Sequence, residues 1–165
     1  IPTLRPAFSR DGGITAANSS SISDGAAALV MTRESVAKAL GLPIVARVVS
    51  HAAHAHEPGL FTTAPVPAMK KALKKAGWDV ADVDLFEVNE AFAVVAMIAQ
   101  KELGIPDDKL NINGGACALG HPIGASGARI LCTLISALQA SGGKKGLASL
   151  CIGGGEATAM AIELP

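Results

Sequence analysis

A glycine-rich stretch around one histidine constrains the fold of this chain more than any other segment. It covers residues 113–129, NGGACALGHPIGASGAR, and contains His121 next to a proline and among five glycines. Glycine lets the backbone adopt positive φ, and proline stiffens the turn that presents the imidazole. Apolar residues then recur at helical spacing, with Ser126 placed to cap the first turn. The pattern predicts a strand, a turn, a histidine and a buried helix, which is where α/β proteins place chemistry.

The composition predicts one aliphatic domain and excludes several classes of function. Half of the 165 residues are apolar but only 3% are aromatic, so small aliphatic side chains must fill the core. The net charge of zero argues against nucleic-acid binding, and no apolar run is long enough to span a membrane. Three widely spaced cysteines without a CxxC pair, together with the lack of a signal peptide, predict a reducing, cytoplasmic location.

Strand and helix patterns alternate along the chain. The candidate strands are residues 26–32, 44–50, 84–88, 109–112, 146–151 and 156–163. The candidate helices are residues 33–40, 65–77, 91–103 and 126–140. We expect an α/β fold with a five-stranded mixed sheet, helices on both faces and a closing hairpin. The helix at 91–103 is apolar all round and should be covered on every side.

A histidine-rich segment at residues 51–57, HAAHAHE, admits two interpretations. Three histidines and a carboxylate so close together are compatible with a metal site. Their spacing places them on one face only in a particular secondary structure, and Pro58 and Gly59 end any helix there. We therefore expect a polar loop and no metal.

Three polar side chains follow three of the candidate strands. Asn89, His121 and Cys151 each open a turn that contains glycine or leads into a helix. A thiol beside an imidazole can exchange a proton near neutral pH. A histidine can donate to an oxyanion beside a water that an asparagine holds, and the backbone N–H groups of residues 153–155 offer a second oxyanion site. Phosphate binding is disfavoured because neither of its glycine signatures occurs. The pattern alone leaves both converging catalysis and purely structural turns open.

Three motifs in order resemble the signatures of the thiolase family. They are VNEAFA at 88–93, the stretch at 113–129, and LCIGGG at 150–155, and the resemblance extends from about Pro6 to the end of the chain. It implies a thiolase-like layered domain in a coenzyme A-dependent acyltransferase that makes or cleaves 3-oxoacyl-CoA. It also implies that residues 1–165 are the C-terminal domain, without the N-terminal domain that bears the nucleophile. The opening Ile-Pro-Thr in place of Met agrees with a fragment or processed product.

The resemblance implies roles for individual residues. Cys151 matches the acid/base cysteine, His121 the histidine that activates the nucleophile and binds the thioester oxygen, and Asn89 the residue that positions a water there. Gly153 matches the backbone donor of a second oxyanion hole. A second set, Ser20, Ala91 and Phe92, matches positions along the pantetheine arm of CoA.

The same resemblance implies that the chain lacks the acyl-carrying cysteine, and it implies which substrates and partners to expect. Neither Cys117 nor Cys132 lies in the signature of the acyl-carrying cysteine, so we expect the chain alone to be inactive. Acetyl-CoA, acetoacetyl-CoA or another 3-oxoacyl-CoA would be the substrate, with no permanently bound cofactor. The expected partners are the N-terminal thiolase domain and further copies, as a homodimer or homotetramer.

Alternative functions remain open at this point. We expect an acetyl-CoA acetyltransferase type of thiolase, but a 3-ketoacyl-CoA thiolase of fatty-acid breakdown shares the same motifs. Ketoacyl synthases share the fold but lack a cysteine in a glycine-triplet motif, so Cys151 argues against them. A non-catalytic CoA or acyl-chain binding module is the alternative from a different class.

Overall fold

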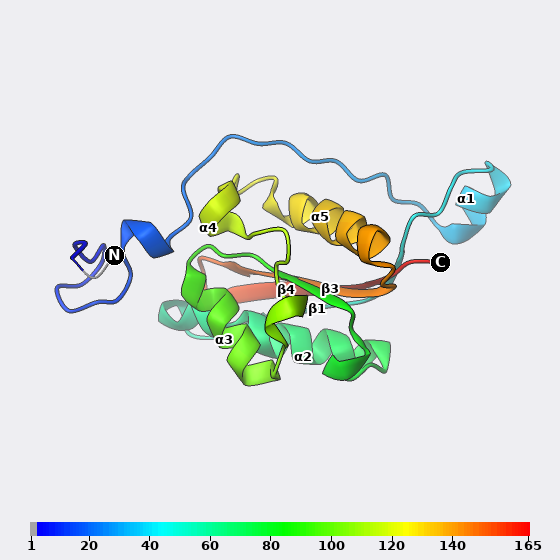
Figure 1. The fold of residues 1–165 in the computed structure, drawn as a ribbon. Coiled ribbons are helices and arrows are strands. Elements are labelled where there is room, and N and C mark those ends of the chain that lie inside the picture. The colour runs from blue at the N-terminus through cyan, green and yellow to red at the C-terminus, as the bar shows by residue number, and fades with distance from the viewer. Residues whose placement is uncertain (1–2) are drawn as a thin grey trace.

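The computed structural model describes residues 3–165 and is built around one mixed sheet (Figure 1). Within these residues the sheet has four strands in the order β1-β4-β3-β2. The strands are β1 (Arg47–Ala55), β2 (Leu85–Val88), β3 (Lys145–Ile152) and β4 (Glu156–Glu163). β2 is parallel to β3, whereas β4 is antiparallel to both of its neighbours. The expected closing hairpin is therefore confirmed as β3–β4.

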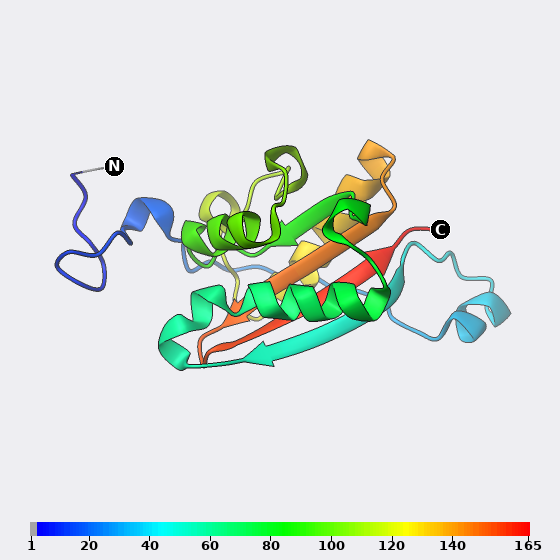
Figure 2. The ribbon, with the colours of Figure 1, turned by 90° about the horizontal axis from the view of Figure 1, so that it is seen from below.

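Helices cover both faces of the sheet, as predicted. The helices are α1 (Glu34–Ala39), α2 (Pro65–Ala76), α3 (Ala93–Leu103), α4 (Ala116–Leu119) and α5 (Ser126–Ser141). α2 and α3 lie on one face and α5 on the other, and the view from below shows α2 along β1 and β4 (Figure 2). None of the helices in the described part of the chain has both the length and the apolar character that crossing a bilayer requires.

Each face of the sheet has its own apolar core. Met69 of α2, Phe86 of β2 and Val95 of α3 belong to the core between the sheet and α2 and α3. Ile130 and Leu134 of α5 belong to the core on the opposite face. Because both faces are covered, β2 is buried at all four positions, as expected for a parallel strand in an α/β protein.

Helix α2 follows the prediction for residues 65–77. Pro65 occupies its first position, where the missing N–H costs no hydrogen bond, and Gly77 ends it in the left-handed conformation at φ 70°. Met69 and Leu73 are buried, while the four lysines of the helix are exposed. The binary pattern alone therefore places this helix correctly.

The predicted number of strands is wrong, because two candidate segments do not join the sheet. Residues 109–112 contribute only an isolated bridge from Leu110 to Phe86. The side chain of Asn111 takes the place of a strand edge, since its Oδ1 accepts from the Val88 N–H at 2.8 Å and its Nδ2 donates to the Val88 carbonyl at 2.9 Å. Asn111 itself adopts a positive φ of 48°, which interrupts an extended strand.

The other unpaired candidate is residues 26–32, which form an extended segment without a strand partner in the described residues. This segment passes over α5 in Figure 1, and Cys132 Sγ of α5 lies 4.0 Å from the Ala28 carbonyl oxygen. Val30 is 96% exposed, so the apolar run that predicted a buried strand is not buried within this chain.

Two further expectations need correction. The histidine-rich segment is not a loop, because β1 continues through Ala55 and pairs with β4 from Arg47 onwards. The residues described contain no group of three or more side chains able to hold a metal ion.

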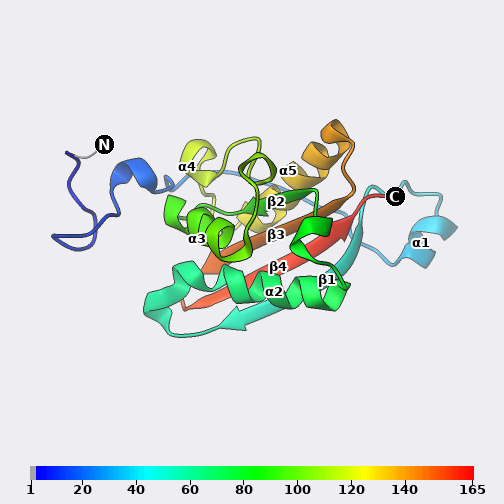
Figure 3. The same cartoon turned by 60° about the horizontal axis from the view of Figure 1, so that its bottom comes forward.

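The helix expected at 91–103 begins at Ala93, and Met97 on its surface is 63% exposed, so it is not covered on all sides. Figure 3 shows α3 at the periphery of the layer that also contains α2.

Candidate active site

Asn89 lies immediately after strand β2 and is almost completely buried. Its backbone N–H donates to the Ser149 carbonyl of β3 at 2.9 Å, which continues the parallel pairing by one residue. Its side chain is directed at the glycine-rich stretch, where Nδ2 lies 3.4 Å from Nε2 of His121. The two residues are thus brought together as predicted, although 32 positions separate them in sequence.

Hydrogen bonds of both the backbone N–H and the imidazole ring fix the position of His121. Gly120 precedes it at φ 90°, a conformation that favours glycine, and the His121 N–H donates to the Ser21 carbonyl at 3.0 Å. Nδ1 of the ring lies 2.6 Å from Oγ of Ser126 in the first turn of α5. Ser126 is fully buried and does not cap α5 as expected, because its hydroxyl is used by the histidine and by the Pro122 carbonyl at 3.1 Å.

These contacts define one direction of hydrogen bonding through the imidazole. The Asn89 amide nitrogen can only donate, so Nε2 of His121 accepts and carries the lone pair. Nδ1 then carries the proton and donates to Ser126, which in turn donates to the Pro122 carbonyl. Burial lowers the pKa of His121, and the nearby charge of Arg129 lowers it further. The ring is therefore a neutral base at pH 7, with its Nε2 lone pair toward the Asn89 amide.

Cys151 lies near the end of β3 and is 8% exposed. Burial raises the pKa of its thiol, which is the protonated acid at neutral pH. The turn at residues 153–155 joins it to β4, and Gly155 has φ 99° with its backbone against the His56 carbonyl and Pro58. Among the described residues no hydrogen bond joins Cys151 to His121, so the convergence predicted for these two side chains stays a prediction.

The serine-rich segment runs beside both Asn89 and His121. Ser20 donates to the Ala91 carbonyl from its N–H at 3.1 Å and from its hydroxyl at 2.9 Å. Ser19 forms an antiparallel bridge with Phe92, and Ile22 forms a parallel bridge with His121. The structure thus brings Ser20, Ala91 and Phe92 together, next to the side chains predicted to be catalytic.

An aromatic cluster borders this segment. Phe92 lies edge-on to Phe8 with ring centroids 5.6 Å apart and to Phe61 at 6.1 Å. Such edge-to-face pairs stabilise the position of the Phe92 ring. Phe61 and Phe8 were not predicted, because nothing in their local sequence indicates that they approach residue 92.

Sequence reasoning also missed several polar residues behind the site. Glu90 accepts from the Cys117 N–H at 3.1 Å and from Asn111 Nδ2 at 3.3 Å, and it lies directly after Asn89 in the motif that predicted the site. Burial and the Glu90 carboxylate raise the pKa of the Cys117 thiol, which disfavours a reactive thiolate there. Glu87 in β2 and Arg129 in α5 form a buried ion pair, with 3.6 Å between Oε2 and Nη1.

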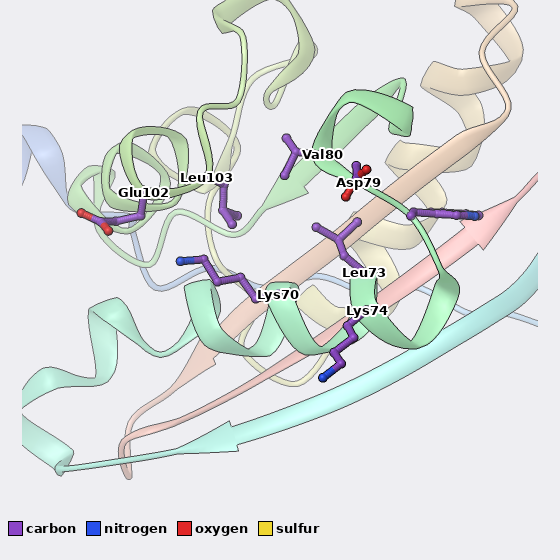
Figure 4. A pocket seen from close by; sticks show the side chains of 8 residues that line it. Lys70, Leu73, Lys74, Asp79, Val80, Glu102 and Leu103 are labelled. Carbon is purple, nitrogen blue, oxygen red and sulfur yellow. The ribbon is translucent and has the colours of Figure 1, made fainter.

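Two hollows on the surface of the described residues lie apart from these side chains. One, of about 380 Å³, is formed by α2, the end of α3 and the turn after Trp78, and Figure 4 shows Lys70 and Glu102 on its opposite walls. Its mixed charges do not favour an anionic ligand. The other is an apolar groove of about 660 Å³ between residues 28–32 and 42–48. Neither hollow is lined by a residue predicted for catalysis.

Comparison with known families tests the resemblance to thiolases that the sequence motifs indicate. The family model described as the thiolase C-terminal domain matches residues 42–164, and that of the thiolase N-terminal domain matches residues 1–35. This chain belongs to the thiolase family. The assignment of all 165 residues to the C-terminal domain was a prediction, and the first 35 residues match the N-terminal domain instead.

Named relatives and solved structures extend this result. The chain is 56% identical over 160 residues to the acetyl-CoA acetyltransferase of Allochromatium vinosum, which covers 97% of this chain and 41% of that protein. It is 56% identical over 163 residues to the acetyl-CoA acetyltransferase of Escherichia coli (strain K12), covering 99% of this chain and 41% of that one. The chain thus spans about two fifths of the length of these relatives.

Two solved structures show the same fold. The Bacillus anthracis acetyl-CoA acetyltransferase superimposes with a TM-score of 0.95 at 44% identity, over 99% of this chain and 42% of that chain. The human mitochondrial 3-ketoacyl-CoA thiolase in complex with CoA superimposes with a TM-score of 0.91 at 40% identity, again over 99% and 42%. The expected thiolase-like α/β fold is confirmed, with four strands in place of five in the described residues.

Proposed function

We propose that this chain supplies the base histidine and the acid/base cysteine of a CoA-dependent thiolase of the acetyl-CoA acetyltransferase type. The observation that carries the proposal is the directed contact from Asn89 through His121 to Ser126, which makes Nε2 the basic nitrogen of a neutral imidazole. The names of the relatives at 56% identity support the acetyltransferase type.

The first half of the reaction needs a base beside a thiol. Nε2 of His121 accepts the proton of a nucleophilic cysteine, which the N-terminal domain would contribute. The thiolate then attacks the thioester carbonyl, the bond to the CoA sulfur breaks, and the acyl group stays on the enzyme. The Nε2–H formed in the first step donates to the thioester oxygen as negative charge develops there, next to Asn89.

The second half needs a proton transfer at the α-carbon of a second thioester. In the condensing direction the Cys151 thiol first gives its proton to the departing CoA sulfur, and the thiolate that remains removes the α-proton of the second thioester. The α-carbon then forms a bond to the acyl carbonyl as the enzyme's sulfur leaves. In the cleaving direction the Cys151 thiol returns a proton to the departing enolate. The raised pKa of Cys151 keeps the thiol protonated at neutral pH and suits the cleaving direction. The backbone N–H group of Gly153 would stabilise the enolate oxygen.

The substrate arm would pass over the serine-rich segment. We assign Ser20, Ala91 and Phe92 to the pantetheine part of CoA, because Ser20 contacts Ala91 and Phe92 bridges the same serine-rich segment that bridges to His121 at Ile22. Acetyl-CoA and acetoacetyl-CoA are then substrates, and the chemistry above requires no permanently bound cofactor.

The proposed partner is the part of the thiolase that this chain does not contain. Residues 1–35 match the N-terminal domain, and the apolar groove formed by residues 28–32 and 42–48 lies where that match ends. Val30 and Met31 on this segment are exposed. We propose that the rest of the N-terminal domain covers them. A homodimer or homotetramer and a cytoplasmic location stay predictions.

A chimera tests the function. In it, this chain replaces the matching part of the Escherichia coli acetyl-CoA acetyltransferase, and thiolysis of acetoacetyl-CoA is followed by loss of its absorbance. We expect activity in the chimera and none in the 165-residue chain alone. His121→Ala and Cys151→Ala should each lower kcat by about 10² to 10⁴, whereas Cys132→Ala on α5 should not. Turnover by the chain alone, or full activity of the Cys151→Ala chimera, would contradict the proposal.

Two competing functions give different outcomes in the same assays. The likeness to human mitochondrial 3-ketoacyl-CoA thiolase favours a longer acyl chain as the second candidate. In that case the chimera's rate ratio between long 3-oxoacyl-CoA and acetoacetyl-CoA exceeds that of the Escherichia coli enzyme. A non-catalytic module would instead bind CoA tightly as the chain alone, which calorimetry detects.

A further inference from the structure

A buried ion pair joins strand β2, which precedes Asn89, to helix α5, which follows His121. Nη1 of Arg129 in α5 lies 3.6 Å from Oε2 of Glu87 in β2. Glu87 is only 2% exposed, and the Arg129 side chain is 19% exposed. No step of the proposed reaction uses either group, so the burial of two charges here needs another reason.

The ion pair completes a ring of contacts around the site. Glu87 lies two residues before Asn89 on the same stretch of chain, and Arg129 lies one helical turn after Ser126. Ser126 in turn holds Nδ1 of His121 at 2.6 Å, and Nε2 of the same ring meets Asn89 at 3.4 Å. A change in the spacing between β2 and α5 therefore changes the contact between the histidine and the asparagine.

A gain in folding stability does not explain why this ion pair is buried. Arg129 makes one further hydrogen bond, from Nη1 to Thr133 Oγ1 at 3.4 Å, while its Nε and Nη2 are buried without a partner among residues 3–165. Unpartnered buried N–H groups and desolvated charges cost free energy. Burial raises the pKa of Glu87, aided by the Glu90 carboxylate, although Arg129 opposes that rise. Such locally unfavourable groups are expected at functional sites.

We propose that Glu87 and Arg129 are positioning residues, which hold α5 against β2 so that Nε2 of His121 meets the Asn89 amide. The charge of Arg129 adds a second effect, because it disfavours protonation of the imidazole and preserves the neutral base. The inference rests on the proposed function only for the catalytic use of His121. The positioning itself is measurable without any turnover.

Nitrogen NMR of the imidazole rings in the 165-residue chain tests the proposal. The chain has four histidines, and comparison with His121→Gln assigns the resonances of interest. We expect His121 in the unaltered chain to carry its proton on Nδ1 and to titrate below the usual histidine range. Arg129→Gln should raise the His121 pKa and mix the two tautomers. Arg129→Lys should keep the pKa low yet still mix the tautomers, because a lysine cannot reproduce the guanidinium geometry.

Glu87→Gln and a matched surface variant complete the design. Glu87→Gln should mix the tautomers as Arg129→Lys does when the spectra are recorded above pH 7, where Glu87 of the unaltered chain is ionised. The control is Arg47→Gln, which breaks an exposed ion pair to Glu34, with 3.0 Å between Nη2 and Oε1, on α1 and β1 away from the site. It should leave the pKa and tautomer of His121 unchanged.

The outcomes separate this proposal from the proposed function. Unchanged His121 spectra in folded Arg129→Gln and Glu87→Gln chains would overturn the positioning role. If Arg129→Gln fails to fold, unchanged spectra in Arg129→Lys and Glu87→Gln would overturn it. A shifted tautomer together with a folded but inactive chimera would support the positioning and overturn the thiolase function. An active chimera with unchanged His121 spectra would support the thiolase function and overturn the positioning role.

Discussion

Replacing Glu87 by glutamine should change how the stability of this protein depends on pH. Glu87 is 2% exposed in β2 and faces Arg129. Burial raises its pKa from the ordinary 4.5 to about 7, against the opposing charge of Arg129. The unfolded chain therefore releases this proton near the ordinary value, while the folded protein retains it until about pH 7.

The sign and size of the effect follow from proton linkage. Between pH 4.5 and about 7 the folded state binds more protons at Glu87 than the unfolded state does, so the free energy of unfolding falls as pH rises. Each pKa unit corresponds to about 1.4 kcal/mol, so ionisation of Glu87 costs about 3 kcal/mol in total above pH 7. Glutamine mimics the neutral acid, and the variant should lack this loss.

Urea unfolding followed by the fluorescence of Trp78, the single tryptophan, measures the effect. We expect the variant and the unaltered chain to have similar free energies of unfolding near pH 4.5. The variant should be more stable by about 3 kcal/mol above pH 7. All other titrating groups are shared, so their contributions cancel in the difference.

A surface carboxylate provides a control of opposite sign. A hydrogen bond from Lys38 and the neighbouring Arg47 lower the pKa of Glu34, so its ionised form is favoured by folding. Glu34→Gln should therefore become less stable relative to the unaltered chain as pH rises through the acid range. If the unaltered chain gains stability over Glu87→Gln between pH 5 and 7.5, attraction to Arg129 outweighs burial and the reasoning about Glu87 is refuted.

Two further substitutions test the geometry of the site. Gly155→Ala should lower the free energy of unfolding by at least about 2 kcal/mol, because φ 99° and the adjacent His56 carbonyl leave no room for a methyl group. Gly153→Ala, where the space is open, should change the free energy of unfolding by less than about 0.5 kcal/mol, and equal losses in the two variants would refute this account. Ser126→Ala should cost about 1 kcal/mol and weaken the preference of His121 for a proton on Nδ1, as measured by urea unfolding and imidazole NMR. A tautomer unchanged by that substitution would show that Ser126 does not orient the ring.

Local patterns alone were sufficient for several elements. Helix α2 has an apolar stripe, a proline at its start and a left-handed glycine after its end, and none of these depends on distant residues. The β3–β4 hairpin is similarly local, since both strands flank the glycine turn at 153–155. The convergence of Asn89 and His121 was predicted from two strand ends, but only Asn89 follows a strand of the sheet, and His121 reaches it from the glycine-rich stretch.

Local sequence is therefore sufficient for the type of most elements and for the family. Tertiary structure decided what depends on a partner far away in the chain. The run at 26–32 has strand composition but no strand beside it, and Asn111 takes the place of a strand edge through its side chain. The tautomer of His121 and the pairing of Glu87 with Arg129 likewise exist only once β2 and α5 pack together. Hydrogen bonds and ion pairs require proximity in space, which residue type and local spacing do not specify.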